Sequence, residues 1–139
     1  MPDNLLARIG VLTISDRASR GEYEDVSGKA INDFLARAMQ SNWVAVVRIV
    51  PDGIESVAQA LTEMVDREGC DLLLTTGGTG PAPRDLTPEA TRMVITRELE
   101  GFGELMRRVS LEQVQTAILS RQTAGTRGKC LIVNLPGRP

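Results

Sequence analysis

The segment RIGVLTIS, residues 8–15, is apolar on both of its alternating faces. A strand with one exposed face alternates between apolar and polar residues, so this pattern is typical of a strand buried inside a parallel sheet. Three further segments are predicted to be strands: residues 43–50, 70–75 and 129–135. Four segments have apolar residues at helical spacing and are predicted to be helices: residues 31–39, 54–68, 87–99 and 103–114. Strands that alternate with helices predict βαβ units and a three-layer α/β/α domain around a mostly parallel sheet.

The start of the third predicted helix carries the clearest local signals. In Thr-Pro-Glu, residues 87–89, Thr can cap a helix, Pro suits its first position, and Glu favours its positive dipole end. Gly101 and Gly103 interrupt the helical pattern and are expected to separate this helix from the next one. The charge run at residues 98–104 is expected to be a solvated segment.

The 139 residues are expected to form a single domain with one core, to which Phe34, Trp43 and the leucines are assigned. Cys70 and Cys130 lie beside apolar runs and lack a nearby partner, so they are predicted to be buried free thiols in a reducing cytoplasm. No run approaches the about 18 apolar residues of a membrane span, and no secretory signal is visible. A soluble, cytoplasmic protein is therefore expected.

The composition excludes several classes of function. The chain has no histidine, which removes Ser-His-Asp and Cys-His catalysis and every imidazole metal site. Sixteen Lys and Arg residues stand against eighteen Asp and Glu residues, for a net charge of −2, and only 3% of the residues are aromatic. Nucleic-acid binders use a basic excess and aromatic stacking platforms, so DNA or RNA binding is disfavoured.

Polar residues and glycines follow each predicted strand. Ligands of open α/β sheets bind beyond the carboxyl ends of the strands, so this coincidence predicts a binding site there. The residues concerned are Ser15, Asp16, Arg17, Asp52, Thr75, Thr76, Gly77, Gly78, Thr79, Gly80, Asn134, Leu135, Pro136 and Gly137.

The run Gly-Gly-Thr-Gly at residues 77–80 can bring several backbone N–H groups toward one anion, and the neighbouring threonines add hydroxyl donors. It is not a Walker loop, because no Gly-Lys-Ser/Thr follows it, and prolines at 81 and 83 prevent a dinucleotide-type helix from starting there. A tight turn without any ligand is the alternative. The loop alone leaves both interpretations open.

Asp52 and Asp85 are the carboxylates best placed for chemistry, because each lies on a loop rather than on a charged helix face. Carboxylates beside a phosphate loop can hold Mg²⁺, which offsets charge during phosphoryl transfer. Each could instead be an ordinary turn or capping aspartate. Asp16 is a weaker candidate, since it could pair with its neighbour Arg17. Three arginines are candidate cations, although surface positions or ion pairs are their default interpretation: Arg17, Arg84 and Arg121.

A set of short motifs occurs in one order along the chain: SDRAS at 15–19, PD at 51–52, TTGGTGP at 75–81, RD at 84–85, TPEA at 87–90, GFGE at 101–104, LSR at 119–121 and NLPG at 134–137. Together they resemble the MogA family of molybdenum cofactor biosynthesis proteins, which also includes the G domain of gephyrin and that of its plant counterpart. The resemblance covers essentially the whole chain. No single motif is unique, but the combination is specific.

The resemblance implies a molybdopterin adenylyltransferase, which converts molybdopterin and ATP to adenylyl-molybdopterin and pyrophosphate with Mg²⁺. It also implies a cytoplasmic homotrimer and a molybdenum insertase as a possible partner. The nucleophile would be the terminal phosphate of molybdopterin, which is already anionic, so no histidine base is needed. The difficulty is repulsion between two phosphates, which alignment and charge neutralisation relieve.

The resemblance also assigns roles to residues. It implies that Asp52 and Asp85 are essential and hold the magnesium ion. Residues 75–80, with Ser15, Asp16 and Arg17, would hold substrate phosphate and pterin. Ser120 and residues 134–137 would line the nucleotide pocket.

The family domain continues beyond the Leu-Pro-Gly segment with a helix and further elements that this sequence lacks, so a pocket without its C-terminal part is expected. The alternative function is a molybdopterin-binding carrier or scaffold without turnover, of the MoaB type. The segments at 15–19 and 51–52 favour the enzyme. A generic nucleotide hydrolase is weakly supported, because no Walker lysine or candidate base accompanies the loop.

Overall fold

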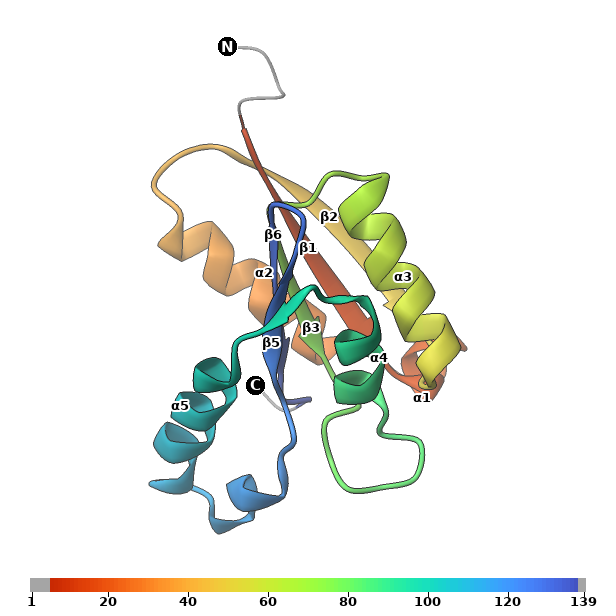
Figure 1. The fold of residues 1–139 in the computed structure, drawn as a ribbon, viewed down its shortest axis with the longest axis vertical. Coiled ribbons are helices and arrows are strands. Elements are labelled where there is room, and N and C mark those ends of the chain that lie inside the picture. Colours follow the sequence, from red (N-terminus) through yellow and green to blue (C-terminus); the bar gives the residue numbers. More distant parts are fainter. Residues whose placement is uncertain (1–5, 138–139) are drawn as a thin grey trace.

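The segment RIGVLTIS lies in the interior of a six-stranded sheet, in a computed structural model that describes residues 6–137. The strand order is β2-β1-β3-β6-β5-β4 (Figure 1). The strands are β1 Ala7–Ile14, β2 Trp43–Val50, β3 Leu72–Thr76, β4 Arg97–Glu98, β5 Ala124–Arg127 and β6 Cys130–Leu135. The first four strands in this order are parallel, and the pairs β6 with β5 and β5 with β4 are antiparallel.

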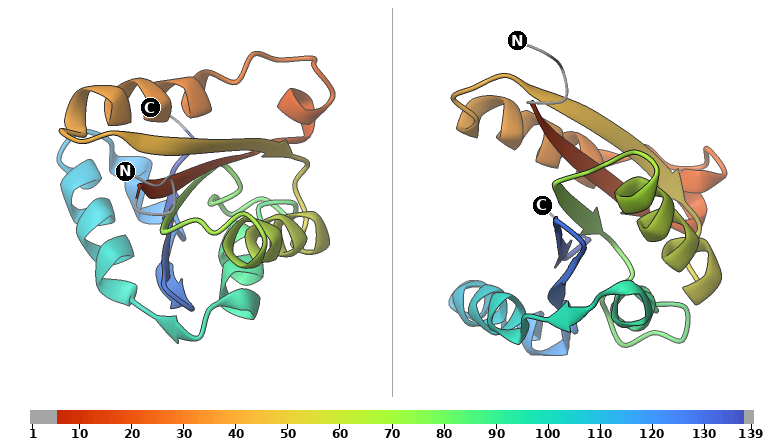
Figure 2. Two further views of the ribbon diagram at one scale, coloured as in Figure 1. Left: turned by 90° about the horizontal axis from the view of Figure 1, so that it is seen from above. Right: turned by 45° about the horizontal axis from the view of Figure 1, so that its top comes forward.

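Helices cover both faces of the sheet, which confirms the predicted three-layer α/β/α architecture (Figure 2). The helices are α1 Asp16–Ser19, α2 Val26–Ala38, α3 Ile54–Asp66, α4 Thr87–Val94, α5 Glu100–Leu111 and the 3₁₀ helix η2 Gln115–Leu119. On one face, Ile9 and Val11 pack with Leu35 of α2. On the other, Leu12 and Ile14 pack with α3 and α4. Both faces of β1 are therefore buried, which explains why its sequence is apolar throughout.

The region after α4 differs from the sequence prediction. The helix expected at residues 87–99 ends at Val94, and the next residues turn into β4. The amide of Thr96 donates to Thr126 and that of Leu99 donates to Ala124, so pairing with β5 ends the helix. The sequence analysis did not predict β5, which is only four residues long.

Gly101 and Gly103 do not separate two helices, as the sequence suggested, because both lie within α5. A Cβ atom at Gly103 would collide with the carbonyl oxygen of Gln122. The glycine therefore lets α5 approach the chain just before β5. Tertiary packing outweighs the low helix propensity of glycine here.

The core prediction is confirmed for Leu12, Leu61 and Leu73, which are fully buried. It is wrong for Phe34 and for exposed leucines such as Leu105 and Leu119. Phe34 is 60% exposed on the outer face of α2, and Trp43 is half-buried. Cys70 and Cys130 are buried and free, as predicted. Within residues 6–137 no helix is long and apolar enough to cross a membrane.

Candidate active site

Parallel pairing brings the predicted site segments to one edge of the sheet. Ile14 at the end of β1 is in register with Val50 at the end of β2. Thr76 at the end of β3 is in register with Thr13 of β1 and with Leu135 of β6. The loops that follow these four strands therefore start side by side, although the sequence separates them by up to about 120 residues.

Asp16 and Asp52 bind each other's backbone. The amide of Asp16 donates to Oδ2 of Asp52 at 3.0 Å, and the amide of Asp52 donates to Oδ1 of Asp16 at 3.1 Å. The Arg84 guanidinium donates to both Asp16 oxygens at 2.7 and 2.9 Å and to the Asp52 carbonyl oxygen at 2.9 Å. Asp16 is thus paired with Arg84 and not with Arg17, whose guanidinium lies over the Tyr23 ring.

The two predicted essential carboxylates reach the same glycine bend. A Cβ atom on Gly78 would lie 3.3 Å from Oδ1 of Asp52, and one on Gly80 would lie 2.9 Å from Oδ2 of Asp85. Burial raises the pKa of the Asp52 carboxyl, and the negative charges of Asp16 and Asp85 raise it further. The hydrogen bond from the Asp16 amide and the charge of Arg84 offset part of this rise in pKa. Asp52 and Asp85, 33 positions apart in the sequence, therefore act on each other electrostatically across the bend.

The backbone of the bend has a conformation that requires glycine. Gly77 and Gly78 have φ of +97° and +69°, and a Cβ on Gly77 would collide with the carbonyl oxygen of Ile14. Thr87 donates through its hydroxyl to the Gly77 carbonyl at 2.9 Å and through its amide to the Gly78 carbonyl at 3.1 Å. The bend is therefore fixed against the start of α4.

The hydrogen bonds that the carbonyl oxygens of the bend accept also determine the direction of its amides. Arg121 accounts for the next two carbonyls, since its amide donates to Thr79 and its Nε donates to Gly80. A trans peptide places its N–H opposite its C=O. The amides of Gly78, Thr79 and Gly80 therefore point away from α4 and Arg121, and no hydrogen bond among the described residues uses them. This arrangement suits an anion better than a simple tight turn does.

A hollow of about 260 Å³ lies beside the bend, and we call it the Ser15 hollow. Its lining includes five predicted site residues: Ser15, Arg17, Thr76, Gly77 and Gly137. The hydroxyl of Thr76 donates to the Pro136 carbonyl at 2.9 Å, and that of Ser27 donates to the Gly137 carbonyl at 2.6 Å. These two bonds hold the segment after β6 against the end of β3 and the start of α2.

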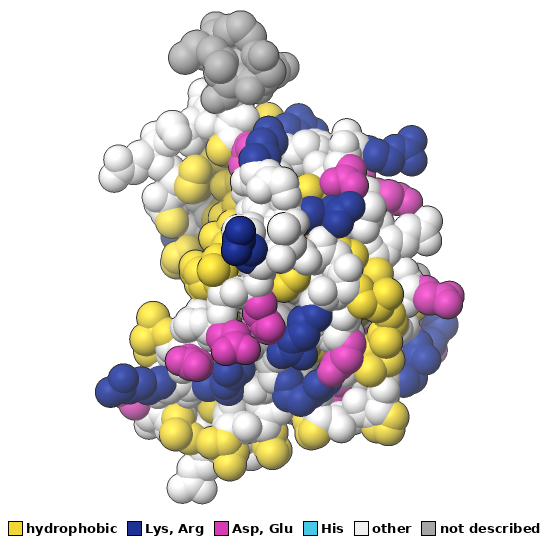
Figure 3. Space-filling model, in the orientation of Figure 1, with side chains coloured by type: hydrophobic (Ala, Val, Ile, Leu, Met, Phe, Trp, Pro, Cys, Tyr) yellow, Lys and Arg dark blue, Asp and Glu magenta, His cyan; other side chains and the backbone are white. Residues whose placement is uncertain are grey.

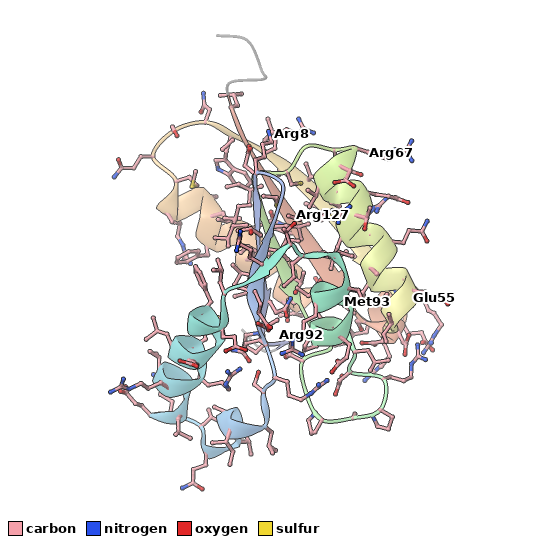
Figure 4. All side chains as sticks on the ribbon, viewed as in Figure 1. Arg8, Glu55, Arg67, Arg92, Met93 and Arg127 are labelled. Atoms are coloured by element: carbon pink, nitrogen blue, oxygen red, sulfur yellow. The ribbon has the colours of Figure 1, made fainter. Side chains whose placement is uncertain are left out.

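A second hollow, of about 470 Å³, lies between α4, β4 and α5, and we call it the charged hollow. Its lining includes Arg92, Glu104, Ser120, Arg121 and Gln122. Figure 3 shows acidic and basic side chains mixed on this face, and Figure 4 shows Arg92 there. Among residues 6–137, the Ser120 hydroxyl and the Gln122 side-chain oxygen are buried and have no hydrogen-bond partner, and Gln122 is only 3% exposed. The hollow is therefore lined by two residues whose buried polar atoms are unsatisfied.

Sequence reasoning missed most residues of the charged hollow. The run at residues 98–104 is largely exposed, as predicted. The sequence did not show that its acidic residues Glu98, Glu100 and Glu104 line the hollow. Glu98 also accepts hydrogen bonds from Arg92 at 2.9 Å and from Thr123 at 2.7 Å. The one sequence signal for this hollow was the group of polar residues at 120–123. It indicates a site only when the pairing of β4 with β5 is known, because that pairing brings these residues next to α4 and α5.

The structure separates residues that the sequence analysis had grouped. Ser120 lines the charged hollow, whereas Gly137 lines the Ser15 hollow. The Asn134 side chain is fully buried and donates to the hydroxyls of Thr75 and Thr91 at 3.1 and 3.0 Å. Its Oδ1 accepts from the Thr123 amide at 3.2 Å. Asn134 and Thr75 therefore lie in the core below the strand ends and do not face the solvent.

Few carboxylates lie near the glycine bend. Among residues 6–137 there is no cluster of three or more His, Cys, Asp or Glu residues with the geometry of a metal cage. Mg²⁺ commonly uses only one or two protein carboxylates together with substrate phosphates. Asp52 and Asp85 fit that requirement, because they approach one bend and Asp52 is partly desolvated.

Known proteins resemble this chain over most of its length. A family model described as "Probable molybdopterin binding domain" matches residues 10–139. A molybdopterin adenylyltransferase of Helicobacter pylori strain J99 is 56% identical over 131 residues, which cover 94% of this chain and 74% of that protein. The one of Escherichia coli K12 is 51% identical over 132 residues, which cover 95% of this chain and 68% of that protein.

Solved structures give the same result. The molybdopterin biosynthesis enzyme MoaB of Thermus thermophilus is 48% identical, with a TM-score of 0.86 over 96% of this chain and 83% of that one. The Mog protein of Mycobacterium ulcerans is 37% identical, with a TM-score of 0.85 over 96% of this chain and 85% of that one. The chain belongs to the molybdopterin-binding domain family of molybdenum cofactor biosynthesis proteins.

Proposed function

We propose that this protein is a molybdopterin adenylyltransferase, which transfers the adenylyl group of ATP to molybdopterin. One observation supports the proposal above all: Asp52 and Asp85 approach a glycine bend whose amides have no hydrogen-bond partner among the described residues. Unpaired backbone amides can bind phosphate oxygens, and the carboxylates supply sites for a cation between them. The identity of 50–56% to proteins named molybdopterin adenylyltransferase supports the same activity.

The chemistry is the joining of two phosphates. The terminal phosphate oxygen of molybdopterin attacks the α-phosphorus of ATP, a new P–O bond forms, and the bond to the β-phosphate breaks to release pyrophosphate. The amides of Gly78, Thr79 and Gly80 hold phosphate oxygens in line, which reduces the entropic cost of reaching the transition state. The nucleophile is already anionic, so a chain without histidine can catalyse this step.

Asp52 and Asp85 would hold Mg²⁺ at this bend. When bound, the ion would offset the negative charge that two phosphates bring together. Asp16 is not available in the same way, because Arg84 occupies both of its carboxylate oxygens. The role of Asp16 and Arg84 is to tie the loops after β1 and β2 together beneath the reacting groups.

The two hollows offer a place for each substrate. The Ser15 hollow includes Thr76 and Gly77 of the bend, and the charged hollow includes Arg121, which contacts Gly80. Phosphates that extend from the two hollows would therefore meet at the bend. Ser120 and Gly137 line different hollows, so we propose that only one of these two segments contacts the nucleotide.

The setting of the reaction is also part of the proposal. Reduced, buried Cys70 and Cys130 suit the cytoplasm. Exposed apolar side chains on α5 and η2, among them Leu105, Val109 and Ile118, support assembly into the homotrimer that the resemblance implies. A molybdenum insertase would receive the adenylylated product.

The test is the formation of adenylyl-molybdopterin and pyrophosphate from ATP, molybdopterin and Mg²⁺, followed by chromatography. Asp85→Asn should abolish the product while the protein stays folded by circular dichroism. Asp33→Asn, which alters an exposed ion pair with Lys29, should leave the rate unchanged. Molybdopterin binding without any ATP affinity in calorimetry would overturn the proposal in favour of a carrier.

A further inference from the structure

The loop that carries Asp85 is held from two sides by arginines. Arg84, within the loop, reaches Asp16 and Asp52. From the other side, Arg121 donates through its amide to the Thr79 carbonyl at 2.8 Å, and through Nε to the Gly80 carbonyl at 3.0 Å. Its Nη2 donates to the carbonyl of Asp85 itself. Arg121 therefore fixes both ends of residues 80–85.

The other bonds of this loop are local. The Asp85 amide donates to the Ala82 carbonyl at 2.9 Å, and the Ala82 amide donates to Oδ2 of Asp85 at 3.0 Å. These two bonds shape the turn but do not attach it to the rest of the molecule. Residues 81–84 are exposed. Arg84, Thr87 and Arg121 attach this loop to the rest of the molecule. Among these three residues, Arg121 is the one that contacts both Gly80 and Asp85.

Glu89 sets the orientation of the Arg121 guanidinium. This residue lies in the first turn of α4 and accepts from Nη1 of Arg121 at 2.6 Å and from Nη2 at 3.1 Å. A two-point contact with the planar guanidinium fixes its direction as well as its position. The bond to Arg121 lowers the pKa of the Glu89 carboxyl, so the pair is ionised at neutral pH. Glu89 lines neither hollow.

We propose that Arg121 is a positioning residue that sets Asp85 against the glycine bend, and that Glu89 holds Arg121 in place. The inference deepens the adenylyl-transfer proposal and rests on it. Arg121 also lines the charged hollow, so a ligand there would contact the side chain that fixes Asp85. Glu89 has no such contact, which makes it the cleaner position to test.

The main variant is Glu89→Gln, which keeps the shape of the side chain but removes the charged two-point contact. We expect kcat for adenylyl transfer to fall about 10- to 100-fold, the effect of a small misplacement of a reacting group, with little change in the KM for ATP. Arg121→Lys should lower kcat to a similar extent, because one ammonium cannot replace the guanidinium fork. Glu89→Gln combined with Arg121→Ala should be no worse than Arg121→Ala alone.

Asp66→Asn is the matched control. Asp66 accepts from two nitrogens of Arg127 at 3.2 and 2.7 Å, and the same guanidinium also binds the Val94 carbonyl at 2.7 Å. This pair has the same chemistry as the Glu89–Arg121 pair, but Arg127 lies at the end of β5 remote from the site loop (Figure 4). The variant should leave kcat unchanged.

Hydrogen exchange of the hydrogen-bonded amides of Ala82 and Asp85, measured by mass spectrometry, provides a readout that does not need activity. We expect faster exchange in Glu89→Gln and Arg121→Lys than in Asp66→Asn. Wild-type exchange in both site variants would overturn the inference, and so would faster exchange with an unchanged kcat. If the wild-type protein forms no adenylyl-molybdopterin, the proposed function fails, and exchange alone then decides whether Arg121 positions the loop.

Discussion

The amide of Asp16 donates to the carboxylate of Asp52, and the amide of Asp52 donates back to the carboxylate of Asp16. This reciprocal pair joins the loops after β1 and β2. It leaves Asp52 half-buried near two other acids, and this burial raises its pKa above the ordinary value of 3.8. The surroundings of Asp52 therefore disfavour its ionised form, so the ionised carboxylate lowers the stability of the folded protein at neutral pH.

Asp52→Asn should make the protein more stable and less active. The pKa of Asp52 is higher in the folded state, so the stability it contributes is present below its unfolded value and is lost as pH rises through the folded value. Without Mg²⁺, the variant should therefore unfold at a higher temperature than the wild type at pH 7, and the gain should shrink toward pH 4. Adenylyl transfer should fall about 100-fold or more.

Asp66→Asn is the opposite case and serves as the control for Asp52→Asn. The hydrogen bond from Arg127 lowers the pKa of Asp66, so its stabilisation is present above the unfolded value and is lost as pH falls. The control variant should be less stable than the wild type at pH 7. A lower unfolding temperature for Asp52→Asn at pH 7 would contradict our account of that site.

Gly77→Ala should disrupt the glycine bend. Its φ of +97° is unfavourable for alanine, and the new Cβ would collide with the Ile14 carbonyl oxygen. We expect a loss of about 1–3 kcal/mol in the free energy of unfolding, together with loss of activity. Gly101→Ala is the matched control, because this glycine lies in α5 with open space around it.

Denaturant unfolding distinguishes the two glycine variants. Gly101→Ala should stabilise the protein by about 0.5–1 kcal/mol, since alanine is the better helix former. Equal effects of Gly77→Ala and Gly101→Ala would show that the bend does not depend on left-handed backbone.

The sequence was sufficient for the parts of the fold with strong local patterns. Residues 43–50 form β2 with the predicted bounds, because an apolar run stopped by Pro51 has few alternatives. The segment at residues 95–99 was assigned to a helix, because its apolar spacing is helical. The strand there was missed, because its pairing partner, β5, lies almost 30 residues downstream. A two-residue strand paired across such a distance has no local signature.

The site, like the fold, has parts that the sequence predicted and parts that it could not predict. Asp52 and the glycine bend were predicted from their place after strands, and register brings those strand ends together. Asp85 was predicted from its place on a loop. The partner of Asp16 was not predictable, because Arg84 is 68 residues away and Arg17 is adjacent. Nor could the sequence show that Asn134 points into the core, since an asparagine after an apolar run also suits a ligand contact.

Asn134→Ala should act through stability rather than through nucleotide binding. The Asn134 side chain bonds to Thr75, Thr91 and Thr123, and its removal would leave buried polar groups without partners. We expect a loss of about 1–3 kcal/mol in the free energy of unfolding, with an unchanged KM for ATP in the folded protein. Asn32→Ala, which removes one bond on partly buried α2, should cost no more than about 0.5 kcal/mol. A raised KM for ATP would instead indicate direct contact between Asn134 and the nucleotide.

Cys70 and Cys130 should be inert thiols that destabilise the fold at alkaline pH. Burial raises the pKa of Cys70 to about 11 and that of Cys130 to about 12, from an ordinary value of 9.0. At pH 8 the thiolate population of folded Cys70 is about 100-fold below that of the unfolded chain, so a disulfide reagent should label the thiols far more slowly without denaturant than with it. Because both pKa values are raised on folding, the stability that the neutral thiols contribute is present below pH 9 and is lost as pH rises toward 11–12. The double variant Cys70→Ala, Cys130→Ala should therefore lose less stability than the wild type between pH 9 and 11, and identical slopes for the two proteins would disprove this account.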